Sequence, residues 1–326
     1  MKYLSFIHPV TKCERAGVIV QPQMPEDETP VYDIGAITGV QPSGTYTLIE
    51  FIAAGAQDTL HTALQQTGAD RFALPLHTLR LLSPIPTPPS VRDFYAFEQH
   101  VRAARARRGA EMIPEWYQFP VFYFSNPSAI QGHNDLIEYP QGSQEMDFEL
   151  EIACVIGKSG KNIPAANASE YIFGYMVMND WSARDLQREE MRMSLGPAKG
   201  KDFATSLGPW LTTPDELAGR RMSSGAEERY DLTITGKVNG KEVSRANFKD
   251  MYYTFPQMLE RASQRVTLRP GDIVGSGTVG TGCILELGPE VQPWLQPGDV
   301  VEMEIERLGI LRNQIIAGAP SETQTQ

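Results

Sequence analysis

The sequence has little cysteine and little histidine. Three cysteines, Cys13, Cys154 and Cys283, lie far apart in a chain of 326 residues, and no C-x-x-C pair occurs. This odd, scattered set favours buried free thiols in a reducing compartment over a disulfide framework. Five histidines are present, and none lies at metal-ligand spacing from another. Neither residue type predicts a zinc site.

Long apolar runs and an excess of positive charge are also absent. No stretch approaches the roughly 18 apolar residues of a membrane span, and the segment MKYLSFIHPVTKCER lacks the apolar region of a signal peptide. We therefore expect a cytoplasmic protein with no membrane partner. Lys and Arg number 29 against 40 Asp and Glu, a formal net charge of -11, which argues against nucleic acid as a partner. A small anionic substrate stays open, because local arginines can override the global sign.

Glycine and proline, with 28 and 24 residues, favour many turns and β structure. Residues 1 to about 80 contain short alternating runs, and a shorter helix is predicted near residues 58–67. The runs are AGVIV, VYDIGAITGV and YTLIEFIAAG. The stretch LSPIPTPPSVRDF then predicts an extended connector, because proline fixes φ and removes a backbone donor. We place a boundary at about residue 85, between a small N-terminal β-rich domain (1–85) and a larger domain (86–326).

Strand-like runs dominate the larger domain, and few helices separate them. Helices are predicted over residues 94–108 with Asp93 as the N-cap, over 182–193 and over 253–263. The strand-like runs are PVFYFSN, DFELEIACVIG, IFGYMVMND, YDLTITGKVNGKEV, GDIVGSGTVG, GCILELG and DVVEMEIERLG. Regular βαβ alternation is absent, so a mixed, mostly antiparallel α+β core is expected. VNGKEV predicts a two-residue Asn-Gly hairpin, and the polar tail GAPSETQTQ is expected to fray.

The run DFELEIACVIG places carboxylates in a predicted strand. Side chains alternate faces along a strand, so Asp147, Glu149 and Glu151 are expected on one face. The even-numbered residues from Phe148 to Ile156 then face the core. Glutamates one strand period apart lie roughly 7 Å apart and repel each other, unless a divalent cation lies between them. Oxygen ligands suit Mg²⁺, Ca²⁺ or Mn²⁺; the alternative is a solvated acidic strand face.

The stretch MVMNDWSARDLQREEM predicts a strand that ends at Asp180 and a helix that follows at once. Asp180 or Ser182 is expected to cap this helix. Arg184 and Gln187 lie three apart and share a helix face, which Arg188 flanks. This arrangement would join a metal ligand to anion-binding donors. The alternative is an N-capped amphipathic helix with surface charges.

The stretch GPAKGKDFATSLGPW predicts irregular backbone whose only cations are Lys199 and Lys201. A lysine in a glycine loop can act as a point charge for a developing oxyanion, and the alternative is a surface lysine. The loop lacks the G-x-x-x-x-G-K-[ST] pattern, so no P-loop is predicted. Elsewhere, Glu286 lies in an apolar run and needs a partner if buried, for which a histidine is one candidate. His100 lies on the first predicted helix of the larger domain, where a lone histidine is more often structural or solvated.

Together these features resemble one family. In chain order the sequence carries Asp93-x-Tyr95 with His100 five residues on, Glu149-x-Glu151, NDWSARD (179–185) with Gln187, Gly200-Lys201, Ser276-Gly277-Thr278 and LEL (285–287). This order resembles the fumarylacetoacetate hydrolase superfamily over roughly residues 80–310. The NDWSARD stretch and the E-x-E strand are specific to it in combination.

The resemblance implies an α+β catalytic domain, a β-rich mixed-sheet roll, with an oxygen-ligated Mg²⁺ or Ca²⁺, Mn²⁺ as a further option, and a homodimer. By matched positions it implies four metal ligands: Asp93, Glu149, Glu151 and Asp180. It implies that Glu286 orients His100, which activates water. The group that stabilises a leaving carbanion would be Arg184, Gln187 and Lys201. Substrate contacts would come from Tyr95, Tyr123 and Thr278.

The implied chemistry is metal-dependent hydrolysis of the C–C bond in a 1,3-diketo acid, fumarylacetoacetate or a related acylpyruvate. Water attacks one carbonyl, and the other half leaves as an enolate. The alternative within the family is an isomerase or decarboxylase of 2-oxo dicarboxylic acids in aromatic-compound catabolism, which does not require a water-activating His–Glu pair. A non-catalytic metal or carboxylate binder would have lost a member of the constellation, whereas every position is filled.

Three departures from the longer eukaryotic fumarylacetoacetases concern the substrate side. The spacing from Thr278 to Glu286 is shorter in this chain, and the N-terminal region is smaller. The loop length near the predicted helix over residues 94–108 differs as well. The arginines of that helix are candidates for holding a substrate carboxylate, and the alternative is a solvated helix face. They are Arg102, Arg105, Arg107 and Arg108.

Overall fold

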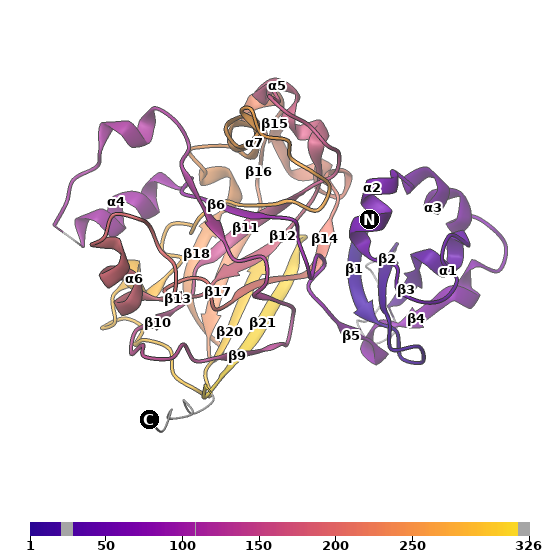
Figure 1. Ribbon diagram of the computed structural model, residues 1–326, viewed down its shortest axis with the longest axis horizontal. Helices are drawn as coiled ribbons and strands as arrows, with labels where there is room; N and C mark the ends of the chain where they lie inside the picture. The colour runs from indigo at the N-terminus through magenta and orange to yellow at the C-terminus, as the bar shows by residue number, and fades with distance from the viewer. Residues whose placement is uncertain (21–28, 108, 319–326) are drawn as a thin grey trace, which may run out of the picture.

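The computed structural model describes residues 1–20, 29–107 and 109–318, and the structural statements that follow concern these residues. Two sheets and a set of short helices build the molecule (Figure 1). The large sheet has the strand order β4 (Ala73–Pro75), β3 (Pro30–Asp33), β2 (Glu14–Ile19), β1 (Lys2–Ile7), β14 (Thr205–Thr212), β12 (Ile172–Asp180), β11 (Leu150–Ile156), β19 (Ile273–Gly275), β6 (Val91–Phe94) and β7 (Phe122–Ser125). The expected mixed α+β class is confirmed.

The second sheet contains the predicted Asn-Gly hairpin. Its order is β18 (Lys241–Asn247), β17 (Thr233–Val238), β20 (Val300–Ile305), β21 (Gly309–Ile316) and β9 (Leu136–Glu138). Asn239 and Gly240 between β17 and β18 both have positive φ, 52° and 78°. A type I′ turn requires this at both central positions, so the hairpin prediction is confirmed.

Short strands attach at the edges and in small pairs. Beside the large sheet, β5 (Arg80–Leu81) pairs with β1 and β8 (Ile130–Gln131) with β14. Two pairs stand apart, β10 (Met146–Asp147) with β13 (Ser182–Ala183), and β15 (Arg221–Ser223) with β16 (Arg229–Tyr230). The predicted strand DFELEIACVIG is thus two strands, because Asp147 pairs with Ser182 and not with the large sheet.

The helices are short and lie around the sheets. They are α1 (Ile34–Thr38), α2 (Leu48–Ala54), α3 (Gln57–Leu64), α4 (Glu98–Ala106), α5 (Ala165–Ala168), α6 (Arg184–Met191), α7 (Phe255–Ser263) and α8 (Ile284–Leu287). Turns of 3-10 helix are η2 (Ala69–Phe72), η3 (Leu76–Thr78), η4 (Pro114–Tyr117), η5 (Ser169–Tyr171), η6 (Pro214–Arg220), η7 (Gly225–Glu227) and η8 (Phe248–Asp250). Figure 1 shows α4 and α6 on the side of the molecule away from α1, α2 and α3.

Two strand-like runs turned out to be helical, and a third, VYDIGAITGV, is a strand only as far as Asp33, where α1 follows. The run YTLIEFIAAG forms α2, because Thr47 and Glu50 make a capping box and Gly55 ends the helix in the left-handed region. The run GCILELG forms the single turn α8. The strand predictions for these two runs were wrong, because a continuous apolar run does not distinguish a buried strand from a buried helix.

The large sheet has a hydrophobic core on each face. Phe148, Leu150 and Ile152 face the core shared with the second sheet, as predicted for the even-numbered residues. Ala153 and Val155 face the other core, to which the N-terminal helices contribute. Every residue of β11 is therefore buried, so a carboxylate on this strand needs a partner.

The N-terminal strands continue the large sheet. β1 pairs with β14, with Lys2 opposite Thr212 and Tyr3 opposite Leu211. Whether residues 1–85 form a separate domain stays a prediction, as do the cytoplasmic location and the homodimer. In the part of the chain that the structure describes, no helix combines the length and the apolar character needed to cross a membrane.

Candidate active site

Four carboxylates meet where neighbouring strands of the large sheet end. Asp93 lies on β6, Glu151 on β11 and Asp180 at the last position of β12, while Glu149 directly precedes β11. Each of the four side chains offers one oxygen, and these oxygens all lie within 4.8 Å of one another. All four residues are buried. The structure thus brings together the four residues that the resemblance matched to metal ligands.

The oxygens of this carboxylate cluster fit a hard divalent cation. Both carboxylate oxygens of Glu151 and Oδ1 of Asp180 are buried and accept no hydrogen bond within the described residues. Buried polar atoms are normally paired, so these three point to a missing cationic partner. A donor set made only of carboxylate oxygens suits Mg²⁺, Ca²⁺ or Mn²⁺ and not a soft metal.

Burial and mutual repulsion set the protonation of the cluster. Burial raises the pKa of Asp93 to about 8, and the charge of Asp180 adds to the effect. Burial likewise raises the pKa of Glu151 well above its ordinary value, with Asp93 as the next cause. Glu149 differs, because Lys201 and Arg184 outweigh burial and lower its pKa. Without a cation, burial and mutual repulsion therefore favour the protonated forms of Asp93 and Glu151, and metal binding would release such protons.

Lys201 reaches the cluster because a glycine precedes it. A Cβ on Gly200 would lie 2.7 Å from the backbone of Gln187, so only glycine allows this loop to approach α6. The Lys201 Nζ donates to Glu149 Oε2 and to Asp180 Oδ2, each at 2.6 Å. Lys199 instead is exposed and pairs with Asp202. Of the two lysines proposed from the loop, the structure places only Lys201 in the site.

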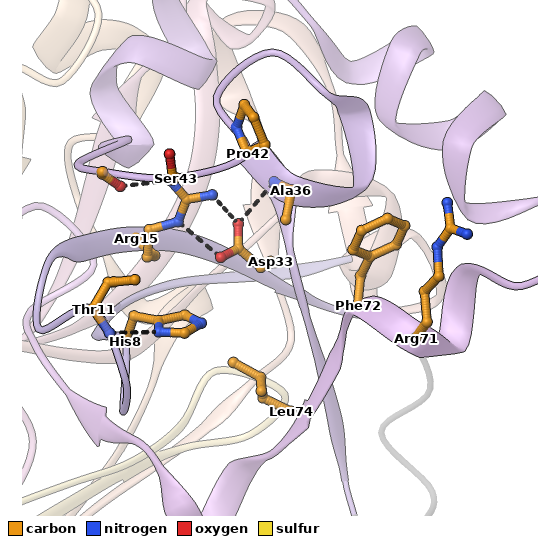
Figure 2. Close-up of a pocket in the computed structure, with 11 residues that line it drawn as sticks. His8, Thr11, Arg15, Asp33, Ala36, Pro42, Ser43, Arg71, Phe72 and Leu74 are labelled. Atoms are coloured by element: carbon orange, nitrogen blue, oxygen red, sulfur yellow. Dashed lines mark hydrogen bonds and ion pairs between the residues drawn. The ribbon is translucent and has the colours of Figure 1, made fainter.

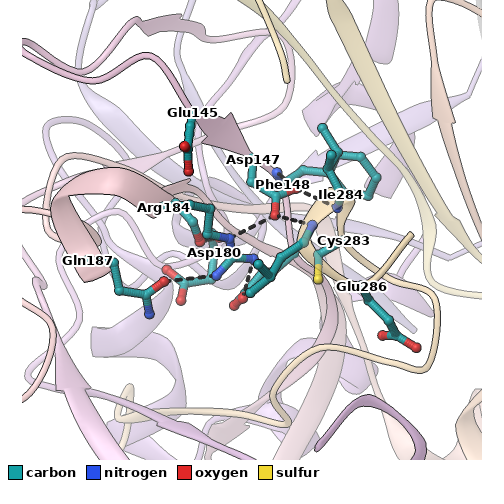
Figure 3. A network of polar contacts seen from close by, with 12 residues as sticks. Glu145, Asp147, Phe148, Asp180, Arg184, Gln187, Cys283, Ile284 and Glu286 are labelled. Carbon is teal, nitrogen blue, oxygen red and sulfur yellow. Dashed lines mark hydrogen bonds and ion pairs between the residues drawn. The ribbon is translucent and has the colours of Figure 1, made fainter. Parts of the chain in front are cut away.

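Arg184 connects the cluster to α6. Its Nη2 donates to Glu149 Oε1 at 2.7 Å, and its Nε donates to Asp147 Oδ2 at 2.8 Å (Figure 3). Its Nη1 donates to Gln187 Oε1 at 3.1 Å, which leaves the Gln187 amide nitrogen as a free donor on the other side. The predicted caps were wrong: Ala183 precedes the helix without a side-chain bond, since Asp180 stays in β12 and Ser182 lies in β13.

Asp93 belongs to a strand and does not cap a helix. Helix α4 begins at Glu98, and its N-cap Phe97 makes no side-chain hydrogen bond, so the predicted Asp93 cap was wrong. Asp93 Oδ1 accepts from the Gly277 N–H at 3.0 Å. Gly277 has a φ of 76°, and a Cβ there would collide with the backbone of β6. The Ser-Gly-Thr loop therefore holds Asp93 in place, and its glycine is required sterically.

His100 and Glu286 form a buried pair. The His100 Nδ1 and the Glu286 Oε2 lie 2.9 Å apart, and each side chain is 5% exposed. His100 comes from α4, and Glu286 from the single turn α8. A carboxylate beside Nδ1 assigns the proton to that nitrogen, which leaves the Nε2 lone pair available as a base.

A cavity of about 680 Å³ joins these groups. Its walls include Phe94, Phe122 and Leu285, so the chemical groups meet an apolar lining. Nine of the twelve site residues expected from the sequence line it: Asp93, Tyr95, His100, Tyr123, Glu149, Arg184, Gln187, Lys201 and Thr278. The other three, Glu151, Asp180 and Glu286, do not line the cavity. Asp180 accepts from Lys201, Glu286 pairs with His100, and a Glu151 oxygen lies within 4.8 Å of an Asp93 oxygen.

The arginines of α4 separate into different roles. Arg105 lines the cavity. Arg188 and Arg192, from α6 and the segment after it, line it too, although neither was among the arginines proposed to hold a substrate carboxylate. Arg102 pairs with Glu98 instead. Arg107 donates to the backbone oxygens of Glu286 and Leu287 at the end of α8. Arg108 lies outside the described residues.

Asp147 is a polar residue of this region to which the sequence assigned no role. The sequence placed it on the face of Glu149 and Glu151, but the break between β10 and β11 turns it toward Arg184 and the start of α8. Its position two residues before Glu149 is the only signal in the sequence. The run that contains Ile284 predicted a strand, so no helix start was expected there.

Comparisons with known proteins agree on one family. Residues 90–316 match the family described as fumarylacetoacetate (FAA) hydrolase, C-terminal. The fumarylacetoacetase of Oryza sativa subsp. japonica is 32% identical in an alignment of 284 positions, which covers 70% of this chain and 66% of that protein. The chain thus spans just under two thirds of the length of the rice enzyme.

Two further similarities cover almost the whole chain. The mitochondrial oxaloacetate tautomerase Fahd2a of Rattus norvegicus is 31% identical in an alignment of 317 positions, which covers 91% of each chain. The structure of the fumarylacetoacetate hydrolase from psychrophilic Exiguobacterium antarcticum superposes with a TM-score of 0.70 at 28% identity, over 97% of this chain and 99% of that chain. This chain therefore belongs to the fumarylacetoacetate hydrolase family, an enzyme family whose members include hydrolases and tautomerases.

Proposed function

We propose that the protein is a metal-dependent hydrolase that cleaves the C–C bond of a 1,3-diketo acid, fumarylacetoacetate or a related acylpyruvate. The His100–Glu286 pair carries the proposal. Hydrolysis needs a base that activates water beside a site that stabilises an enolate, and the pair supplies such a base; a tautomerase would use a base of this kind to remove a carbon-bound proton. His100 lines the same cavity as Glu149 and the donors Arg184, Gln187 and Lys201.

The carboxylate cluster is the proposed holder of the divalent cation. The residues are Asp93, Glu149, Glu151 and Asp180. When bound there, Mg²⁺, Ca²⁺ or Mn²⁺ supplies Lewis-acid polarisation of the substrate carbonyls. The three unpartnered oxygens of Glu151 and Asp180 support this role.

Different side chains around the cavity accept the proton and stabilise the developing negative charge. The His100 Nε2 accepts a proton from water, and the oxygen of that water bonds to one carbonyl carbon of the substrate. The bond from that carbon to the central CH₂ breaks, and its electron pair leaves with the CH₂ carbon as an enolate. Arg184, Gln187 and Lys201 donate toward the charge that develops. The CH₂ carbon takes back a proton, so an acylpyruvate and water give a carboxylic acid and pyruvate.

A product assay with a small substrate panel tests the proposal. Fumarylacetoacetate and acetylpyruvate are incubated with the metal-free protein, with and without added Mg²⁺, Mn²⁺ or Ca²⁺. We expect one of these diketo acids to be split into two acids only when a metal is present. Absence of cleavage for every diketo acid and every metal would overturn the proposal.

Tautomerisation of a 2-oxo dicarboxylic acid is a second candidate. It is favoured by the similarity to the rat oxaloacetate tautomerase, which covers 91% of both chains, whereas the match to the rice fumarylacetoacetase covers 66% of that enzyme. The same protein preparation is assayed for keto–enol conversion of oxaloacetate. Conversion without cleavage of any diketo acid selects this candidate over hydrolysis.

A further inference from the structure

Asp147 is a completely buried carboxylate that lies outside the carboxylate cluster. Its Oδ1 accepts from the backbone N–H groups of Phe148 at 2.8 Å and Ile284 at 2.7 Å. Its Oδ2 accepts from Leu285 N–H at 3.0 Å and from Arg184 Nε at 2.8 Å. Figure 3 shows the side chain between Arg184 and the backbone of Ile284. Both oxygens are thus used to hold other parts of the protein.

The helix that Asp147 touches is the one that carries Glu286. Helix α8 has a single turn, and the side chain of its N-cap residue Cys283 caps none of its N–H groups; the Cys283 Sγ lies 4.0 Å from the His100 Nδ1. The N–H groups of its first two residues go to Asp147 instead, which lies 137 and 138 positions earlier in the chain. A negative charge at a helix N-terminus satisfies free N–H groups and interacts favourably with the helix dipole.

The other end of the same turn is also fixed from outside. Arg107 donates through Nε to the Glu286 carbonyl at 2.8 Å and through Nη2 to the Leu287 carbonyl at 2.6 Å. One turn of helix is not stable alone, because nucleation is unfavourable. The distance of 2.9 Å between Glu286 and His100 therefore depends on these external contacts.

We propose that Asp147 is a positioning residue: it caps α8 and so holds Glu286 against His100, while it holds Arg184 against Glu149. This inference rests on the proposed function, in which His100 is the base. It assigns no contact between Asp147 and the substrate or the metal. Outer carboxylates that orient inner groups typically account for about 10–100-fold in activity.

A second buried pair provides a matched control. Asp33 accepts from Arg15 Nε at 2.8 Å and from Arg15 Nη2 at 2.7 Å, and it also accepts from the Ala36 N–H as the N-cap of α1 (Figure 2). It thus combines a buried arginine partner with a helix cap, as Asp147 does. It lies on β3 in the N-terminal part of the chain and does not line the 680 Å³ cavity.

The experiment compares Asp147→Asn, Asp33→Asn and Glu286→Gln. Steady-state kinetics with the diketo acid gives kcat and KM, and proton NMR follows the low-field signal of the His100 Nδ1–H, which His100→Ala assigns. For Asp147→Asn we expect kcat to fall about 10–100-fold with KM within about threefold. The NMR signal should be lost or shifted, as in Glu286→Gln. Asp33→Asn should keep both kcat and the signal, although it also removes a buried carboxylate that pairs with an arginine.

A double variant tests whether Asp147→Asn lowers kcat through Glu286. Added to Glu286→Gln, the Asp147→Asn change should lower kcat by a smaller factor than it does alone, because the part of its effect that acts through Glu286 is already lost and only the part that acts through Arg184 remains. Full additivity would overturn the inference, and so would an unchanged NMR signal in Asp147→Asn. If the wild-type protein shows the signal but splits no diketo acid, the proposed function fails, and the NMR comparison still decides the position of Asp147.

A milder variant covers the case in which Asp147→Asn does not fold. Ile284→Pro removes one N–H donor to Asp147 and leaves the carboxylate and Arg184 in place, and Ile284→Val controls for the change to its completely buried side chain. Proline is tolerated at the first position of a helix, and Cys283 before it has the extended backbone that proline requires. We expect a three- to tenfold lower kcat and a shifted NMR signal, by the same outer-contact scale. Wild-type values of both would contradict the inference.

Discussion

The two buried arginine–aspartate pairs of this protein have the same inner geometry and different surroundings. Arg15 and Asp33 lie 2.7 Å apart at their closest atoms, and Arg184 and Asp147 lie 2.8 Å apart. Each aspartate also accepts from the first turn of a helix. Burial and pairing therefore do not distinguish the two regions.

The difference lies in the remaining donors of each arginine. Arg15 uses them on the backbone carbonyls of Gln41 and Gly44, so its contacts end in the local loop. Arg184 uses them on Glu149 and Gln187, which line the cavity. A buried pair thus becomes part of a candidate site through what its outer contacts reach.

Replacing each arginine is expected to give the largest difference in activity between the two pairs. Arg15→Met and Arg184→Met each leave a buried aspartate without its partner, which costs about 3–5 kcal/mol of unfolding free energy. Only Arg184→Met should also lower kcat, by about 10²–10³-fold, because it removes a donor to the developing enolate. Denaturant unfolding and steady-state kinetics on both variants measure the two effects. Equal kcat values for the two variants would remove the functional difference between the pairs.

The pH dependence of stability should come from the carboxylate cluster. Folding raises the pKa of Asp93 to about 8 and that of Glu151 well above its ordinary value, so the folded metal-free protein binds more protons than the unfolded chain. The associated stability is present below the ordinary carboxyl pKa and is lost as pH rises through about 8. The Tm of metal-free protein should therefore fall by several degrees between about pH 6 and about pH 9.

Two comparisons test the origin of that slope. Saturating Mg²⁺ should raise the Tm more at the higher pH, because the cation replaces the protons of the cluster. Arg15→Met should keep the slope of the parent protein, since its pair is separate from the cluster. Calorimetry with and without chelator provides the measurement, and a Tm of the metal-free protein that rises over this interval would contradict the assignment.

The smallest effect is expected from the contact at the far end of α8. Arg107 is partly exposed: it bonds to the backbone carbonyls of Glu286 and Leu287, and it pairs with the exposed side chain of Glu290 at 3.2 Å. Arg107→Ala should lower kcat about three- to tenfold through a looser Glu286, with little change in Tm. Arg102→Ala, on the same helix and paired only with Glu98 and Tyr117, serves as the control for kinetics. A larger loss of activity in Arg102→Ala would place the functional contact elsewhere on α4.

The sequence predicted those features that depend on short-range patterns. The Asn-Gly hairpin follows from backbone preferences of two residues, and the core face of β11 follows from strict alternation. The α+β class follows from the density of strand-like runs without βαβ order. The proximity of Asp93, Glu151 and Asp180 came from the family resemblance, since nothing local joins β6, β11 and β12.

Features that depend on long-range contacts were not predicted from the sequence. The helix α8 is held by Asp147 and Arg107, both more than a hundred positions away, so its own apolar residues resemble a strand. Asp93 precedes a helix, but the pairing of β6 with β19 keeps it in the sheet. Asp147 has its partners because β10 pairs with β13, which no periodicity reveals.

The most direct test of the account is the turnover of His100→Ala at saturating Mg²⁺, measured together with Mg²⁺ binding. His100 is the proposed base, and it lies outside the carboxylate cluster. We expect the variant to bind Mg²⁺ as the parent protein does and to lose more than about 10²-fold in kcat for the diketo acid. Diketo-acid cleavage within about tenfold of the parent rate, with Mg²⁺ bound, would contradict water activation by His100.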